Sequence, residues 1–398
     1  MRISTSNSYN NSLDSLMQRQ AALSGTQEQM TTGKRVNHAS DDPAAAARAE
    51  RALAAERRSV ASQRAVDASN NAMTLTESAL ADAGSLLQQV REALVAAGNA
   101  TYSDAERTGV ANQIADLRQQ LFAVANRTDG SGTYLFGGQG SSQAPFADVP
   151  GGIQFQGTSG QLQAASGEAL PLTMDGESTW MNARTGNGVF TASAVTSTGS
   201  AWIDTGSVID PSLVTGSTYS LQFSISAGAT TYSVLKDGAP TAQTNVAFTP
   251  GQAIQVDGLS ATITGQPANG DVFQLAPSSP SLSVFDALDQ AVADLKTPGR
   301  SATRIAQSNV TNLANVDSVL GQVLSGRAQI GATLNRVDAV TDRLSALKLS
   351  SQTERSNAED LDLTQAISDF SNQQTGYDAA LKAYSMVQRL SLFNYLNT

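Results

Sequence analysis

The sequence of 398 residues contains no cysteine and a single histidine, His38. Without cysteine, disulfides and thiolate metal sites are excluded. With one histidine, histidine-based catalysis and metal ligation are disfavoured. Aromatic residues make up only 5% of the chain, which is low for a protein with one large close-packed core. No run of about 18 apolar residues occurs, so we expect no membrane-spanning helix.

An excess of basic charge is also lacking. The formal net charge is −10, which argues against nucleic acid as a partner, because phosphate binding needs a clustered basic face. The N-terminus, Met1-Arg-Ile-Ser-Thr-Ser-Asn-Ser, has no apolar stretch and no small-residue cleavage site of the Sec type. If the protein leaves the cell, we expect a route that uses no cleaved signal.

The candidates for chemistry are few. Asp41 and Asp42 could act as a carboxylate pair, but helix capping beside Pro43 explains all three residues. The segment Gly137-Gly-Gln-Gly resembles a phosphate loop only in its glycines, since no Gly-Lys-Ser/Thr ending follows. No nucleophile–base set stands out beyond one built on His38. The sequence therefore predicts neither an enzyme nor a cofactor.

The stretch from Leu361 to Leu396 has apolar residues in four-three spacing, which is typical of a coiled-coil helix. The spacing is broken at Gln374, and the helix finishes on further apolar residues. A stripe this narrow needs a partner helix to bury it. The predicted interface residues of this helix are Leu363, Ile367, Phe370, Tyr377, Leu381, Tyr384, Phe393, Tyr395 and Leu396.

A matching stripe lies near the N-terminus, between Ile3 and about Gly33. Its predicted interface residues are Tyr9, Leu13, Leu16, Leu23 and Met30, with Gln20 and Gln27 in the same rows. Each terminal helix would be roughly 50 Å long at 1.5 Å rise per residue. Polar residues in the stripes lower the stability of the pair. We therefore expect the terminal helices to pair weakly and to need further contacts.

A helix break follows the first stripe. Gly33 suits the C′ position of one helix, Asp41 and Asp42 supply capping oxygens, and Pro43 suits the first turn of the next. A long alanine-rich helix is predicted from Pro43 to about Ala97, and a third helix carries Val110 to Val124. Helical spacing returns at Val284 and dominates to the end.

The segment 137–281 differs sharply in composition. It holds 20 of the 32 glycines, and its nine acidic residues outnumber its two basic ones, for a net charge of −7. Short strand candidates are separated by Asp-Gly and Asn-Gly turns, which is typical of an all-β module. The candidates are Tyr219–Ile225, Thr230–Leu235, Gln252–Val256, Ala261–Thr264 and Asp271–Leu275, and Thr133–Gly138 is predicted as a strand that leaves the helices.

The predicted fold is mainly α with an inserted all-β module, in which N- and C-terminal segments form a long antiparallel helical bundle. We expect three parts. Residues 1–42 with 350–398 form a terminal coiled coil, residues 43–136 with 282–349 form a helical rod, and residues 137–281 form the outer β-rich domain.

Two local sequences resemble a known family. The segment Thr32-Gly-Lys-Arg-Val-Asn-His-Ala-Ser-Asp-Asp-Pro-Ala-Ala is similar to the one between the first two helices of the flagellin superfamily. Arg327-Ala-Gln-Ile-Gly-Ala-Thr-Leu-Asn-Arg resembles its C-terminal counterpart. The start Met1-Arg-Ile-Ser-Thr, the segment Thr128–Gly138 and the ending Leu390-Ser-Leu-Phe-Asn-Tyr-Leu resemble the hook–filament junction branch of that superfamily rather than flagellin itself.

The resemblance implies a secreted, extracellular structural protein of the bacterial flagellum, located where hook meets filament. It implies export by the flagellar type III route with a dedicated chaperone. The implied partners are hook-associated protein 1, flagellin and further copies of the chain in a ring, with no nucleic acid and no membrane insertion. Paired terminal helices would form an inner tube and the β module the outer surface.

Two alternatives stay open at this point. The chain could be a flagellin, which is a bulk filament subunit. More distantly, the β module could bind glycans as an adhesin, with Trp180 and Trp202 as a stacking surface, although lone tryptophans in β domains are more often core residues.

Overall fold

The structure is a computed structural model that describes residues 5–396 apart from 142 and 165–167, with side chains described at Asn7 and, within the same limits, from Tyr9 to Met386. The chain divides into two compact units. Unit 1 comprises residues 1–64 and 340–398, and unit 2 comprises residues 65–339. This division is coarser than the three parts expected from the sequence, and its boundaries fall inside two long helices.

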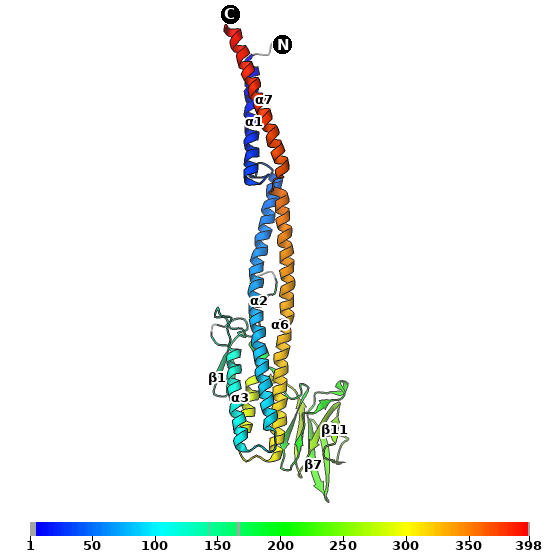
Figure 1. Cartoon of the computed structure of the whole chain (residues 1–398). Helices are drawn as coiled ribbons and strands as arrows, with labels where there is room; N and C mark the ends of the chain where they lie inside the picture. The colour runs from blue at the N-terminus through cyan, green and yellow to red at the C-terminus, as the bar shows by residue number, and fades with distance from the viewer. Residues whose placement is uncertain (1–4, 142, 165–167, 397–398) are drawn as a thin grey trace. The chain divides into compact units, whose positions relative to one another are not determined.

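Unit 1 consists of paired helices. Helix α1 (Thr5–Thr32) and helix α7 (Leu363–Leu396) run antiparallel and side by side (Figure 1). The beginning of α2 (Pro43–Ala97) pairs with the end of α6 (Ala302–Glu359), where Glu56 accepts hydrogen bonds from Gln352 at 2.8 Å and Arg355 at 3.0 Å. Helices α1, α2 and α7 begin and end close to the positions that the apolar spacing and the capping residues predict, whereas α6 continues beyond the expected boundary at residue 349.

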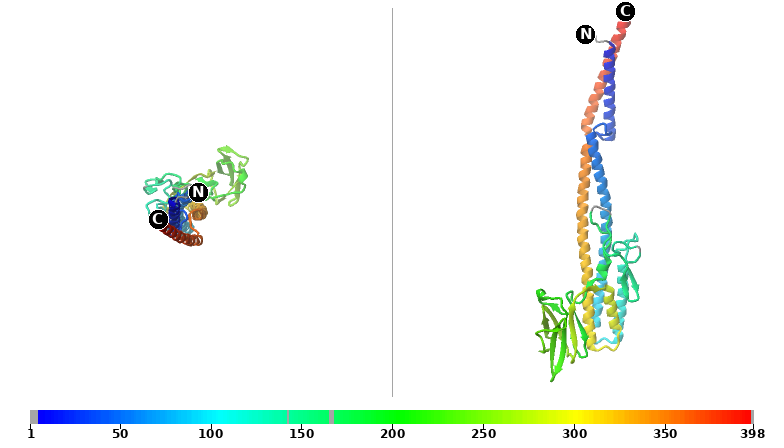
Figure 2. Two further views of the ribbon diagram at one scale, coloured as in Figure 1. Left: turned by 90° about the horizontal axis from the view of Figure 1, so that it is seen from above. Right: turned by 180° about the vertical axis from the view of Figure 1, so that it is seen from behind.

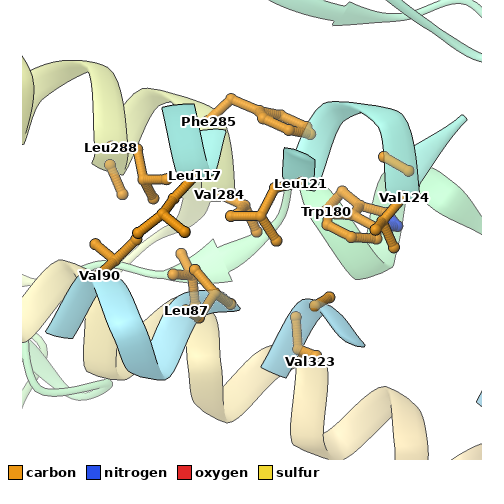
Figure 3. Packing of buried hydrophobic residues seen from close by; sticks show 14 of the residues in the cluster. Leu87, Val90, Leu117, Leu121, Val124, Trp180, Val284, Phe285, Leu288 and Val323 are labelled. Atoms are coloured by element: carbon orange, nitrogen blue, oxygen red, sulfur yellow. The ribbon is translucent and has the colours of Figure 1, made fainter. Parts of the chain in front are cut away.

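The helical part of unit 2 contains a large apolar core. The rest of α2 and α6 packs with α3 (Asp104–Ala125) and α5 (Val284–Lys296). Ser103 and Glu106 form a capping box at the start of α3, and Ser283 caps α5. Side chains from all four helices point toward one another in Figure 3, which labels Leu87, Val90, Leu117, Leu121, Val124, Val284, Phe285, Leu288 and Val323.

The segment between α3 and the β module packs onto this helical core. It contains the hairpin β1 (Phe146–Val149) with β2 (Gly152–Phe155) and the short helix α4 (Gly176–Trp180). The Trp180 ring stacks on Phe285, with centroids 5.9 Å apart and planes at 11°, and meets Phe136 edge-on at 5.3 Å. The change in composition at Gly137 therefore does not coincide with a boundary in packing.

The predicted strand at Thr133–Gly138 is wrong. This segment forms turns and isolated bridges, Thr128 with Tyr134 and Gly137 with Asp175. The physical reason is that two consecutive side chains, Leu135 and Phe136, are both buried in the helical core. A strand would point them to opposite faces.

The independent β module begins and ends at one two-stranded ribbon, β3 (Ala183–Arg184) with β14 (Pro280–Leu282). Its larger sheet has the order β10-β8-β7-β13-β4 with β9 beside β8, and the smaller has β11-β12-β5 with β6 beside β12. Figure 2 shows the module beside α6. The strands are β4 (Phe190–Thr196), β5 (Trp202–Ile203), β6 (Ser207–Val208), β7 (Tyr219–Ser226), β8 (Ala229–Lys236), β9 (Ala239–Pro240), β10 (Val246–Ala247), β11 (Ala253–Val256), β12 (Leu259–Thr264) and β13 (Val272–Pro277), and the 3-10 turn η1 spans Pro211–Leu213.

The module has a core of its own, separate from that of the helices, built on residues such as Phe223 and Phe273. Each of the five strands expected between Tyr219 and Leu275 is present, with ends that differ by a few residues. The mainly helical fold with an inserted antiparallel β module, expected from the sequence, is confirmed.

Candidate assembly surface

The predicted interface residues of α1 lie where the spacing places them. Leu13, Leu16, Leu23 and Met30 are half-buried, and Tyr9 is 38% exposed. Gln20 and Gln27 are exposed. Among the described residues of α1 only Thr26 is buried, and its hydroxyl donates to Gln373 of α7 at 2.9 Å. The helix therefore contacts α7 without burying any large apolar side chain completely.

On α7 the predicted stripe divides into two rows. Phe370, Tyr377 and Tyr384 are half-buried, and the Tyr384 hydroxyl donates to that of Tyr9 at 2.6 Å. By contrast, the side chains of Leu363, Ile367 and Leu381 are exposed to 53%, 51% and 46%. Phe393, Tyr395 and Leu396 belong to the helix, but their side chains lie outside the part of the chain that is described.

The less exposed row of α7 is shifted from the predicted stripe by one position at several turns. It runs through Ala366, Phe370, Gln373, Tyr377, Ala380 and Tyr384. Small side chains allow two helices to approach closely, and a methyl group added to Gly376 would come within 2.6 Å of the Arg19 guanidinium. Thr26 of α1 and Ala366 and Gln373 of α7 are contact residues that the prediction from the apolar spacing missed. The alanines and the glycine on this face of α7 are the signal that could have indicated Ala366 and Gln373.

The helix break contains a compact set of contacts between two chain segments. An antiparallel bridge joins Lys34 to Asp360, with backbone hydrogen bonds from Arg35 N to the Glu359 carbonyl (2.7 Å) and from Leu361 N to the Gly33 carbonyl (3.0 Å). Gly33 has φ +72°, a left-handed conformation that glycine adopts without strain and that ends α1.

The two acidic residues of the break, Asp41 and Asp42, accept hydrogen bonds from different backbone groups. The Asp42 carboxylate accepts from Ala45 N at 2.9 Å and so caps α2, which begins at Pro43. That of Asp41 accepts from His38 N at 2.8 Å and Asn37 N at 3.1 Å, and so closes the loop before the helix. Backbone donors lower the pKa of both carboxyl groups, with Arg35 adding to the effect at Asp42.

Three other features bear on the predictions from the sequence: clusters of metal ligands, long apolar helices and the two tryptophans. Within residues 5–396, gaps excepted, no three acidic or histidine side chains gather as a metal site would require. Over the same part of the chain, no helix has the length and apolar character of a membrane span. Trp180 is completely buried in the helical core, whereas Trp202 lies in the β module, so the two rings do not form one stacking surface.

Paired terminal helices around a variable insertion define the class of protein. Residues 3–141 match the family model of the bacterial flagellin N-terminal helical region, and residues 313–396 match that of the C-terminal helical region. The flagellar hook-associated protein 3 of Escherichia coli (strain K12) is 27% identical over 398 residues, which covers 99% of each chain. Such coverage includes the β insertion.

Solved structures give the same result. A crystal structure of FlgL from Xanthomonas campestris is 30% identical with a TM-score of 0.68, covering 77% of this chain and 99% of that one. A hook-associated protein 3 from Legionella pneumophila is 26% identical with a TM-score of 0.70, covering 77% and 96%. The chain belongs to the hook-associated protein 3 family, the junction proteins of the flagellin superfamily. It is a structural protein of the flagellar hook–filament junction and not an enzyme.

Proposed function

We propose that this chain is the adapter that joins the hook to the flagellin filament, with hook-associated protein 1 on one side and flagellin on the other. Copies of the chain form a ring whose α1 and α7 helices line the inner tube. The subunits reach this extracellular position through the flagellar type III export route, held beforehand by a dedicated chaperone.

The exposed apolar row of α7 is the observation that carries the proposal. The pairing of α7 with α1 leaves the large side chains of Leu363, Ile367 and Leu381 about half exposed, in one row along the helix. A further apolar side chain, Met17 of α1, is 56% exposed. Fully burying one such side chain is worth about 1.5 to 3 kcal/mol, so contacts with neighbouring subunits would stabilise helices that pair weakly within one chain.

The same reasoning makes assembly and folding of the terminal helices one event. Ordering a residue costs about 1 to 2 kcal/mol in conformational entropy, and half-buried stripes interrupted by Gln20, Gln27 and Gln374 return little of it. Neighbouring subunits supply the missing burial. We therefore infer that the termini are largely disordered in the free monomer and fold on incorporation.

The experiment is complementation of a strain that lacks this gene. The deletion should leave hooks without filaments and release flagellin to the medium, as seen by electron microscopy and immunoblotting. Leu381→Asp should fold but fail to restore filaments, because a charge would be buried between subunits. Asn372→Asp is the matched control. It lies nine residues away, on the opposite side of the helix at 100° per residue, and is also exposed. Filaments attached normally in the Leu381→Asp strain would refute the role of this row.

A further inference from the structure

The contacts at the helix break carry an inference of their own. We name the clamp as the segment Gly33–Arg35 together with Ala358–Leu361. We propose that the clamp sets the register in which α1 and α7 pair, so that the terminal helices order with one alignment only. The proposal concerns a single chain and does not depend on the flagellar role.

The backbone of the clamp allows one alignment. The bonds from Arg35 N to the Glu359 carbonyl and from Leu361 N to the Gly33 carbonyl cross in opposite directions on either side of the Lys34–Asp360 bridge. Moving one strand by a single residue would break both bonds, because donors and acceptors alternate along an extended chain.

Side chains reinforce this alignment. Lys34 Nζ lies 3.2 Å from Glu359 Oε2, and Arg35 Nη2 donates to the Ala358 carbonyl at 2.9 Å. Arg35 Nη1 lies 3.3 Å from Asp42 Oδ2, and Gln29 Nε2 donates to the Arg35 carbonyl at 2.8 Å. Arg35 therefore connects the end of α6 to the cap of α2, and Gln29 connects the last turn of α1 to Arg35.

The terminal helices specify their register poorly by themselves. A shift of one heptad moves a helix by roughly 10 Å and places each stripe position on an equivalent one. Few side chains would resist such a shift, because α1 buries only Thr26 and α7 only Ala366 among their described residues. The hydrogen bonds of Thr26 with Gln373 and of Tyr9 with Tyr384 join α1 to α7 in the alignment in which the clamp is closed.

The clamp is placed where it has the most influence on pairing. Gly33 directly follows the last residue of α1, and Leu361 stands two residues before the first of α7. Closing the clamp therefore leaves almost no free chain before the first helical turns meet. Loop-closure entropy is then small, and the helices extend from a fixed starting point.

The experiment uses the absence of cysteine in the natural chain. Thr26→Cys is combined with Gln373→Cys, or with Ala366→Cys or Ala380→Cys as partners shifted by one heptad in either direction. Each full-length pair is treated with a short bismaleimide, and links within one chain are quantified by mass spectrometry. Ammonium sulfate is added until circular dichroism shows that the terminal helices are ordered, since it strengthens apolar contacts.

With the clamp unchanged, the cross-link between positions 26 and 373 should form about tenfold more than the cross-links from position 26 to 366 or 380. Leu361→Pro removes one backbone donor and should lower this preference about tenfold, whereas Leu361→Ala keeps the donor and should preserve it. Lys34→Ala with Arg35→Ala leaves the backbone intact and should weaken the preference even if Leu361→Pro prevents folding. Undiminished preference for 373 in the double alanine variant and in any folded Leu361→Pro protein would overturn the proposal.

Discussion

The two units differ in what they bury and in the charge they carry. Unit 2 buries large side chains such as Leu87, Phe285 and Phe273 in two cores. Among the described residues of unit 1, the buried apolar side chains are small: Val36, Ala45, Ala49, Ala52, Val340, Ala358 and Ala366. Because the apolar contribution to stability grows with buried area, we expect unit 2 to fold alone and unit 1 to gain little from folding without a partner.

The net charges of the two units also differ. Unit 1 has 14 basic and 13 acidic residues, a net charge of +1, whereas unit 2 has 11 basic and 22 acidic residues, a net charge of −11. A nearly neutral surface can meet copies of itself without long-range repulsion, whereas an acidic surface stays solvated. Under the proposed assembly, association and solubility therefore belong to different parts of one chain.

The largest expected effect is on amide hydrogen exchange. In a dilute monomer, residues 5–30 should exchange almost as fast as an unstructured peptide, while α3 and α5 should be protected by several orders of magnitude. The physical reason is the missing core of unit 1. Exchange followed by mass spectrometry measures both regions in one sample, and assembled protein is the control. Strong protection of residues 5–30 in the monomer would remove the distinction between the units.

A second comparison makes the same substitution in each unit. Leu87→Ala should destabilise the protein by about 2 to 5 kcal/mol, because Leu87 is completely buried. Leu363→Ala should change the stability of the monomer by less than about 0.5 kcal/mol, because the side chain is 53% exposed. Urea unfolding followed by circular dichroism gives both values. Similar losses in the two variants would show that unit 1 has a core after all.

A smaller effect is expected inside the β module. The buried Asp271 carboxylate accepts four hydrogen bonds, from Thr198 N and Oγ1, Gly199 N and Ala268 N. Asp271→Asn places an amide against these donors and should cost the module about 2 to 3 kcal/mol. Trp202 fluorescence in a Trp180→Phe background reports unfolding of the module. The helical core, followed by Trp180 in a Trp202→Phe background, should stay unaffected.

The same carboxylate makes the module sensitive to acid. Burial by itself would raise the pKa of Asp271, but the hydrogen bonds from Thr198, Ala268 and Gly199 prevail and lower it. A depressed pKa in the folded state stabilises the module above the unfolded value of about 3.9, and this contribution is lost as the pH falls through the folded value. We expect acid unfolding from about pH 4 downward, and an Asp271→Asn module should lose this part of the pH dependence.

The smallest effect concerns the attachment of the module to α6. The Gln307 amide accepts from Ile203 N at 2.9 Å and donates to the Ile203 carbonyl at 3.2 Å, in the manner of an adjacent strand. Gln307→Ala should cost about 1 kcal/mol and increase proteolytic cleavage near residues 185–189. Gln307→Glu keeps only the acceptor. Its stability and cleavage rate should lie between those of Gln307→Ala and the unchanged protein. Equal cleavage rates in all three proteins would contradict this role.

The helices show what apolar spacing and capping residues can predict. These two signals located α2 at Pro43–Ala97 and the apolar stripe of α1, because both are local in sequence. They did not separate the two rows of α7. Leu363 and Phe370 fit one heptad pattern equally well, yet Leu363 is exposed and Phe370 is half-buried. Which row faces α1 depends on how closely the helices approach, which spacing does not encode.

Composition likewise identified the insertion only in part. Glycine and acidic residues marked 137–281 as one segment, but Phe146 and Trp180 belong to the helical core. Composition records solvation and turn preference, whereas membership of a core depends on contacts between residues far apart in sequence.

The sequence by itself determined that the terminal segments are helices with weak apolar stripes and that a β module lies between helical halves. It also indicated that no enzyme chemistry is present. These properties follow from local periodicity, capping and the absence of reactive residues. Only the tertiary structure decided that Gly33–Arg35 meets Ala358–Leu361 and that Leu363, Ile367 and Leu381 are exposed. Both results depend on backbone segments more than 300 residues apart in the chain coming together.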